Sequence, residues 1–158
     1  MSENNEKNSL RMYSELCAML DKEEFTYTKD EEHLAVELIM RTDDIDLQVK
    51  CSIWRSTSVA VLTADLGFNV PDDKVSQVLE AIARINEITV NGSFEYLFRS
   101  QRIRFSITQM GVESLIGAST LGHLFYVMLS TADDYNEKLF MITQGKYSMQ
   151  ELIDYLNE

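Results

Sequence analysis

The chain has 158 residues, of which 45% are hydrophobic and 25% are charged. This composition fits one globular domain that can fold without a disulfide or a metal. The net charge of −12, from 14 basic and 26 acidic residues, argues against binding to nucleic acid or to a membrane surface, because both are bound through Lys and Arg. The acidity can serve solubility alone, or it can favour basic partners.

The cysteines and the hydropathy pattern point to an intracellular protein. Cys17 and Cys51 lie in apolar runs without the spacing of a redox or metal motif, so buried free thiols are expected. The first ten residues contain no apolar signal region, and no later run approaches the roughly 20 apolar residues of a membrane span. We therefore expect a cytoplasmic location.

The first part of the chain predicts a tail, a helix and then strands. Residues 1–8 are polar and are expected to form a flexible tail, and residues 9–158 a single domain. Apolar residues at helical spacing predict a helix that ends near Lys22. Alternating apolar residues then predict three strands, at 34–40, 47–53 and 59–63, and Phe25 and Tyr27 indicate a further short strand before them.

The middle of the chain predicts a helix followed by a hairpin. Pro71 and the two carboxylates after it are typical of a first helical turn, and the helix should end near Asn91-Gly92. A two-residue turn at Ser100-Gln101 would pair aromatic and aliphatic residues on one buried face against the next helix. The pairs are Phe98 with Ile103, Tyr96 with Phe105, and Phe94 with Ile107, and this register places Arg99 opposite Arg102.

The last part predicts a long helix over residues 117–143, with Gly145 as its C-cap. Ser148 and Glu151 have the spacing of a capping box, so residues 146–158 should form an appended C-terminal helix. The predicted class is therefore α+β, an antiparallel sheet packed against helices in the order α-β-β-β-α-β-β-α with an extra short helix at the end.

This order resembles the type III secretion chaperone-like fold, and several segments are similar to the YbjN family. They are Val70-Pro71-Asp72-Asp73-Lys74, Ile85-Asn86, Gly92-Ser93-Phe94-Glu95, Thr131-Ala132-Asp133-Asp134-Tyr135 and Gly145, and the resemblance covers residues 22–145. The family often has a proline after the aromatic residue at 135, where this chain has Asn136. The resemblance implies a bacterial cytoplasmic protein, of a family labelled as sensory transduction regulators, that binds other proteins and often dimerises.

Two groups of residues are candidate protein-binding sites. Arg99, Arg102 and Arg104 cluster on the outward face of the hairpin, where they can either protect a sheet edge or dock an acidic segment. Apolar residues outside the main stripe of the long helix form the second group, which consists of Tyr126, Val127, Phe140 and Met141. A helix that is apolar on more than one face is buried on more than one side, so either a partner, such as a second copy, or the final helix should cover it.

The sequence contains no pattern that favours catalysis. His33 and His123 have no partners at metal-site or triad spacing, and the neighbouring Asp133 and Asp134 do not face each other on a helix. We therefore expect no enzyme activity, no metal and no cofactor. The predicted function is a non-enzymatic protein-interaction module, a regulator or chaperone-like factor. The alternatives are a dedicated type III secretion chaperone for an effector and, third, a small-molecule-binding domain.

Overall fold

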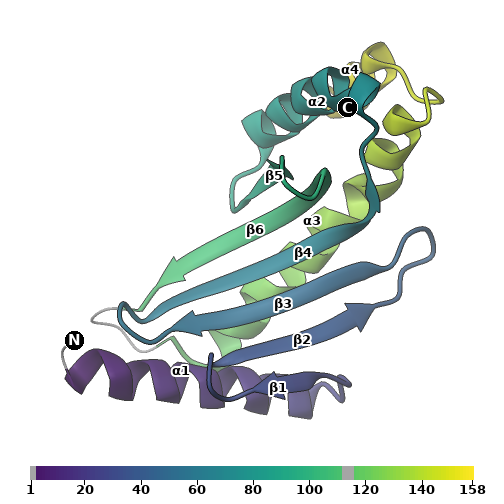
Figure 1. The fold of residues 1–158 in the computed structure, drawn as a ribbon. Helices are drawn as coiled ribbons and strands as arrows, with labels where there is room; N and C mark the ends of the chain where they lie inside the picture. The colour runs from purple at the N-terminus through teal and green to yellow at the C-terminus, as the bar shows by residue number, and fades with distance from the viewer. Residues whose placement is uncertain (1–2, 112–115) are drawn as a thin grey trace.

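A computed structural model describes residues 3–111 and 116–158 and shows one six-stranded antiparallel sheet with helices on one side and at one end (Figure 1). The strands are β1 (Thr28–Asp30), β2 (Ala35–Met40), β3 (Leu47–Trp54), β4 (Val59–Asn69), β5 (Ser93–Leu97) and β6 (Arg102–Met110), in the spatial order β1-β2-β3-β4-β6-β5. The helices are α1 (Glu3–Lys22), α2 (Val75–Ile88), α3 (Ala118–Thr143) and α4 (Met149–Leu156), and a 3-10 turn (Asp72–Lys74) precedes α2.

The predicted α+β class and element order are confirmed. A short strand precedes β2, but it is β1 at Thr28–Asp30 and does not include the predicted Phe25 and Tyr27. Among the described residues, no helix has both the length and the hydropathy needed to cross a membrane.

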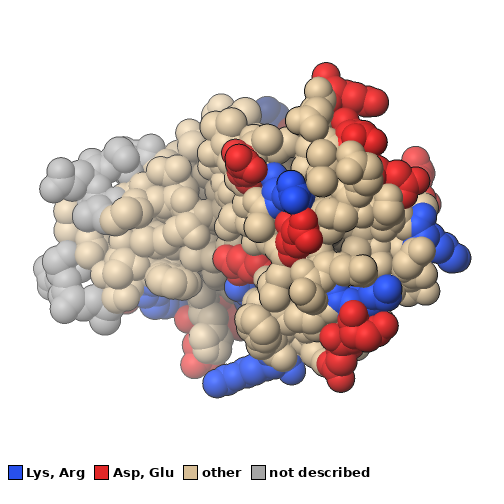
Figure 2. All heavy atoms as spheres, turned by 90° about the horizontal axis from the view of Figure 1, so that it is seen from above, with Lys and Arg blue, Asp and Glu red and all other residues tan. Residues whose placement is uncertain are grey.

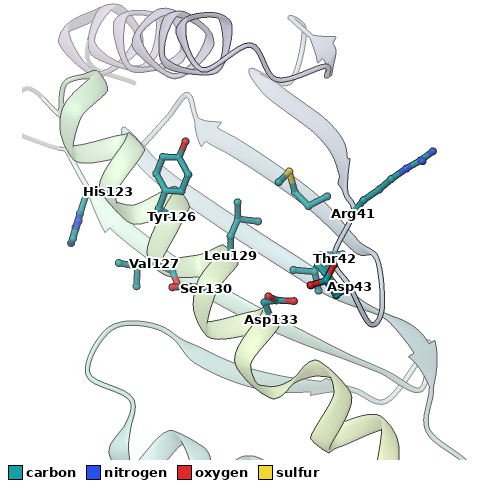
Figure 3. A pocket seen from close by; sticks show the side chains of 11 residues that line it. Arg41, Thr42, Asp43, His123, Tyr126, Val127, Leu129, Ser130 and Asp133 are labelled. Carbon is teal, nitrogen blue, oxygen red and sulfur yellow. The ribbon is translucent and has the colours of Figure 1, made fainter.

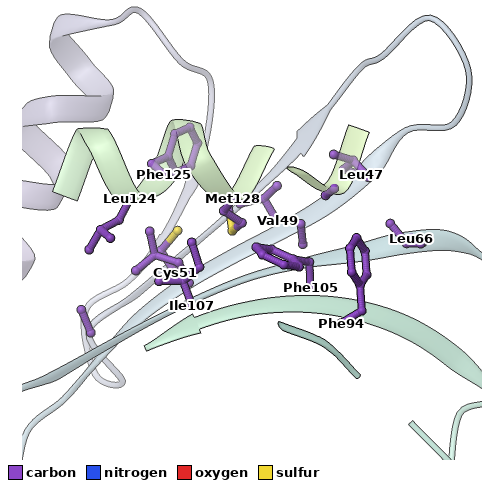
Figure 4. Close-up of a cluster of buried hydrophobic side chains, with 14 of the residues drawn as sticks. Leu47, Val49, Cys51, Leu66, Phe94, Phe105, Ile107, Leu124, Phe125 and Met128 are labelled. Atoms are coloured by element: carbon purple, nitrogen blue, oxygen red, sulfur yellow. The ribbon is translucent and has the colours of Figure 1, made fainter. Parts of the chain in front are cut away.

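The core lies between the sheet and the two helices α1 and α3, and Figure 1 shows α3 crossing behind β3 and β4. Alternate residues of each strand point to this face, which makes it apolar, as expected for a sheet buried on one side. Figure 4 shows part of the core, including Leu47, Val49, Cys51, Leu66, Phe94, Phe105, Ile107, Leu124, Phe125 and Met128.

Both cysteines are buried free thiols, as predicted. Burial raises the pKa of the Cys51 thiol to about 12, so this thiol stays protonated at neutral pH.

The opposite face of the sheet is open and mostly polar. Two rows of side chains cross it from strand to strand, because residues that are paired in an antiparallel sheet point to the same side. The first row consists of Ile39, Gln48, Asp65, Arg104 and Glu95, and the second of Thr28, Glu37, Lys50, Thr63, Ser106 and Ser93. We call this surface the open face.

The first helix begins at Glu3, so the predicted tail over residues 1–8 is wrong for residues 3–8, while Met1 and Ser2 lie outside the described residues. Polar contacts explain the difference. The Asn5 side chain donates to the Ser56 carbonyl at 3.0 Å, and the Ser9 hydroxyl lies 3.1 Å from that of Ser58, with both serines fully buried. The polar side chains at the start of α1 therefore contact the β3–β4 turn.

The predicted hairpin register is wrong by two residues. Phe94 pairs with Phe105, Tyr96 with Ile103 and Leu97 with Arg102, so a longer turn over residues 98–101 replaces the two-residue turn. A shift of two keeps each side chain on its predicted face. Phe94, Ile103, Phe105 and Ile107 are accordingly buried and Tyr96 is half-buried, but Phe98 moves into the turn and is 73% exposed.

The end of the chain follows its local signals. Gly145 adopts a φ of +67° after α3, and the Lys146 amide donates to the Met141 carbonyl at 2.9 Å, as in a Schellman cap. Ser148 and Glu151 form the predicted capping box of α4. This helix buries Leu152, packs against α2, and places the Tyr155 ring 6.2 Å from the Tyr135 ring of α3.

Candidate functional site

The three arginines do not form a free basic cluster. Arg104 lies directly opposite Glu95, and their side chains form an ion pair at 2.6 Å. On its other side Arg104 faces Asp65 of β4. Burial raises the pKa of the Asp65 carboxyl, and the charges of Arg102 and Arg104 oppose that increase. Arg104 is therefore neutralised by carboxylates within the sheet.

Arg102 lies opposite Leu97, not opposite Arg99 as predicted, and its side chain has a structural role. The β4–β6 ladder shifts register between Asp65 and Asn69, so Leu66 has no paired residue on β6. The Arg102 guanidinium donates to the Leu66 carbonyl at 3.0 Å and to Gln48 Oε1 at 3.2 Å. Of the three arginines, only Arg99, in the β5–β6 turn, belongs to the exposed residues.

The open face carries a groove of about 780 Å³. Its lining comes mainly from β2, β3 and β4 and includes Tyr27, Glu37, Ile39, Arg41, Gln48, Lys50, Asp65 and Arg104. We call it the open-face groove. Its charges are largely paired, because Lys50 binds Glu37 at 2.7 Å and Arg104 binds Glu95. At the end of the molecule that carries α2 and α4, acidic and basic side chains are likewise interspersed (Figure 2).

The four apolar residues predicted on the long helix divide into two groups. Phe140 is half-buried, with its ring 5.2 Å from that of Phe68 in β4, and Met141 is half-buried one residue further. Tyr126 and Val127 instead line a second groove. The final helix contacts Tyr135 and Lys138 of α3, which are further along the helix.

This second groove, of about 620 Å³, runs between α3 and the β2–β3 loop, and we call it the helix groove (Figure 3). Tyr126 lies toward one end, and Asp43 and Asp133 point toward each other at the other end. Its lining consists of Met40, Arg41, Thr42, Asp43, Leu47, His123, Tyr126, Val127, Leu129, Ser130 and Asp133. The apolar part is accessible, since Tyr126 is 46% exposed and Met40, Val127 and Leu129 are half-buried.

The β2–β3 loop, which forms one wall of the helix groove, is held from two sides. The fully buried Asn136 of α3 donates from its amide to the Ile45 carbonyl at 3.1 Å. On the other side the Asp46 carbonyl lies against Gly67, where a Cβ atom would be only 2.9 Å from that oxygen. Thr42 organises the loop itself, because its hydroxyl donates to the Ile45 carbonyl at 3.0 Å.

Both grooves are open to solvent, and their chemistry is that of a contact surface. Enclosed apolar pockets are the usual sites for small ligands, and neither groove is of that kind. Within the described part of the chain, no three His, Cys, Asp or Glu side chains are grouped so that they could hold a metal ion. What the helix groove offers is accessible apolar area beside carboxylates.

Sequence reasoning found two residues of the helix groove, Tyr126 and Val127, and missed the opposite wall. Asp43 and its acidic neighbours indicated only a turn between strands, and Met40 only the end of a strand. Leu129 lies between the stripe residues of α3 and was not singled out. The contact between this loop and α3 joins residues about ninety positions apart. A local sequence pattern therefore cannot predict it.

Comparison with solved structures places this arrangement among known proteins. A chain of the HopA1–SchA chaperone–effector complex matches with a TM-score of 0.62 at 14% identity, over 83% of this chain and 97% of that chain. YbjN from E. coli matches with a TM-score of 0.58 at 10% identity, over 82% of this chain and 90% of that chain.

A chain of the ExsC–ExsE complex matches with a TM-score of 0.55 at 12% identity, over 88% of this chain and 97% of that chain. The chain has the fold of these proteins. The predicted resemblance to YbjN and to the type III secretion chaperone-like fold is thus confirmed at the level of structure. No protein-family model matches the sequence, and no curated protein matches it significantly.

Proposed function

We propose that the chain is a non-enzymatic protein-interaction module that acts as a regulator or chaperone-like factor in a bacterial cytoplasm. The observation that carries the proposal is the helix groove, whose apolar side chains are accessible to a partner. The shared fold supports it, since one structure with this fold is a chaperone–effector complex.

Affinity capture tests the proposal. The full chain is immobilised, incubated with a lysate of the bacterium that encodes it, and the bound proteins are identified by mass spectrometry. Leu129→Asp places a charge in the helix groove and should abolish capture of a specific partner. Ile39→Asp is the matched control, because Ile39 is 66% exposed in the open-face groove and the charge change is the same.

The controls separate the outcomes. Circular dichroism must show that both variants are folded. Capture that is lost with Ile39→Asp and kept with Leu129→Asp would move the binding site to the open face. A wild-type chain that enriches no protein above the empty matrix would contradict the proposed function.

A narrower function is that of a dedicated secretion chaperone for one effector. The match to a chain of the HopA1–SchA chaperone–effector complex favours this second candidate. It requires that the captured partner be a secreted protein, and that the partner lose solubility when the chain is deleted from the host. A cytoplasmic partner would favour the regulator instead.

We further propose that the chain forms a homodimer. Phe140 is half-buried, and its ring already packs against that of Phe68 within the chain. The surface of α2 is the better candidate, since Leu79 and Ile88 are 38% and 52% exposed. Sedimentation at micromolar concentration should show a dimer that Leu79→Asp weakens, and a monomer at every concentration would contradict it.

A further inference from the structure

Two carboxylates from different elements face each other at one end of the helix groove. Asp43 belongs to the β2–β3 loop and Asp133 to α3, and Figure 3 shows them pointing toward each other. Both residues are exposed. Among the described residues, neither carboxylate lies within ion-pair distance of a basic side chain.

The other charged side chains around the helix groove do not neutralise this pair. Arg41 and His123 both line the groove, but the Arg41 side chain extends away from α3 (Figure 3). Toward the Tyr126 end there is another carboxylate, because the Tyr126 hydroxyl donates to Glu23 Oε2 at 3.0 Å. The groove thus has acidic ends and an apolar middle.

The fold holds the two carboxylates in this arrangement. The Asn136 amide donates to the Ile45 carbonyl at 3.1 Å and to Asp133 Oδ1 at 3.4 Å, so one buried side chain links the loop to the helix that carries Asp133. Like charges that face each other raise the free energy of the molecule, and a cation placed between them lowers it.

We propose that the helix groove binds a segment of a partner protein in which a Lys or Arg adjoins apolar side chains. The cation lies between Asp43 and Asp133, and the apolar side chains lie on Met40 and Leu129. This inference rests on the proposed function and adds the chemistry of the partner. A second copy of the chain is not the proposed occupant, because the homodimer proposed above uses the exposed Leu79 and Ile88 of α2 instead.

A peptide selection tests this chemistry without knowledge of the natural partner. A phage library of random short peptides is selected on the full chain, and the enriched peptides are synthesised. Their dissociation constants are measured by fluorescence anisotropy for the wild type and for two double variants. Asp43→Asn with Asp133→Asn removes the facing pair, and Asp44→Asn with Asp134→Asn is the matched control, because these exposed neighbours do not line the groove.

The enriched peptides should combine apolar residues with Lys or Arg. Their affinity should fall about two- to fivefold for each carboxylate removed from the groove, as for exposed ion pairs, and should change little in the matched control. Leu129→Asp should abolish binding. The same peptide with Lys or Arg replaced by Gln should bind the wild type and the two double variants equally weakly.

Four results would overturn the inference. Enriched peptides without basic residues, or equal losses in both double variants, would show that the facing pair does not select the partner. Self-association strengthened by Asp43→Asn with Asp133→Asn would identify a second copy as the occupant. A selection that enriches nothing rejects the inference alone if affinity capture finds a partner, and rejects the proposed function as well if capture is also empty.

Discussion

The two grooves share Arg41 at their border, but they differ in whether their charged side chains form ion pairs. In the open-face groove, Lys50 binds Glu37 and Arg104 binds Glu95 across neighbouring strands. In the helix groove, Asp43 and Asp133 face each other, and neither pairs with a described basic residue. A surface that pairs its own charges has little electrostatic free energy to gain from a partner, whereas one that leaves like charges facing has more.

The two grooves also differ in the source of their walls. Neighbouring strands form most of the open-face groove, so the sheet ladder alone sets its geometry. The helix groove depends on a loop and a helix that meet through Asn136. Its geometry should therefore be the more sensitive of the two to single substitutions.

The largest expected effect is at Asn136, which is fully buried. Asn136→Asp would bury a carboxylate beside Asp133 and should lower the free energy of unfolding by about 3–5 kcal/mol at neutral pH. The buried carboxyl would have a raised pKa, so the loss should be absent below the unfolded-state pKa of about 3.9 and should grow as the pH rises. Urea denaturation across this range measures it, and a loss that does not depend on pH would contradict the explanation.

Leu47 and Ile39 compare the apolar residues of the two grooves. Leu47 is 1% exposed beneath the helix groove, and Leu47→Ala should lower the free energy of unfolding by about 2–5 kcal/mol because it leaves a cavity. Ile39 is 66% exposed, and Ile39→Ala should change the same free energy by at most about 0.5 kcal/mol. Similar values from chemical denaturation would mean that the open face is covered in solution.

The Arg104–Glu95 ion pair tests whether the charges of the open face are paired in solution. Both side chains are about one-third exposed, so a double-mutant cycle with Arg104→Gln and Glu95→Gln should give a coupling free energy of about 1 kcal/mol or less. Exposed Lys50 and Glu37 should give a smaller value. No coupling at either pair would remove the contrast between the grooves.

The smallest expected effect concerns Asp65, whose pKa is raised above 3.8 chiefly by burial. The folded state then holds a proton that the unfolded state has lost, so this residue reduces stability as the pH rises above about 3.8. Asp65→Asn should remove that part of the pH dependence. Relative to the wild type, the variant should be more stable at pH 7 than at pH 4. Melting temperatures of the wild type and the variant, measured at both pH values, test this prediction.

Much of the fold could be predicted because it rests on local signals. Alternating apolar residues indicated β2, β3 and β4, and Gly145 with the Ser148–Glu151 box marked the end of α3 and the start of α4. Each of these depends on a few neighbouring residues. The hairpin face was also predictable, because alternation determines the face and tolerates a register error of two.

Contacts between distant segments were not predictable in this way. The turn over residues 98–101 and the β4 shift near Leu66 together place Arg104 opposite Glu95 and Arg102 on a backbone carbonyl. From the sequence these arginines formed a solvent-facing cluster. Only the pairing of strands shows which carboxylate or carbonyl each one reaches.

The sequence by itself determined the class of the domain, its order of elements and the face that each strand buries, because hydrophobic period and caps act over one or two turns of chain. The tertiary structure alone decided that Phe140 packs against Phe68, and that Tyr126 and Val127 line a groove with Asp43 on its far wall. The physical reason is that a groove forms where two elements meet, and here the meeting depends on Asn136, a buried amide whose partner is about ninety residues away.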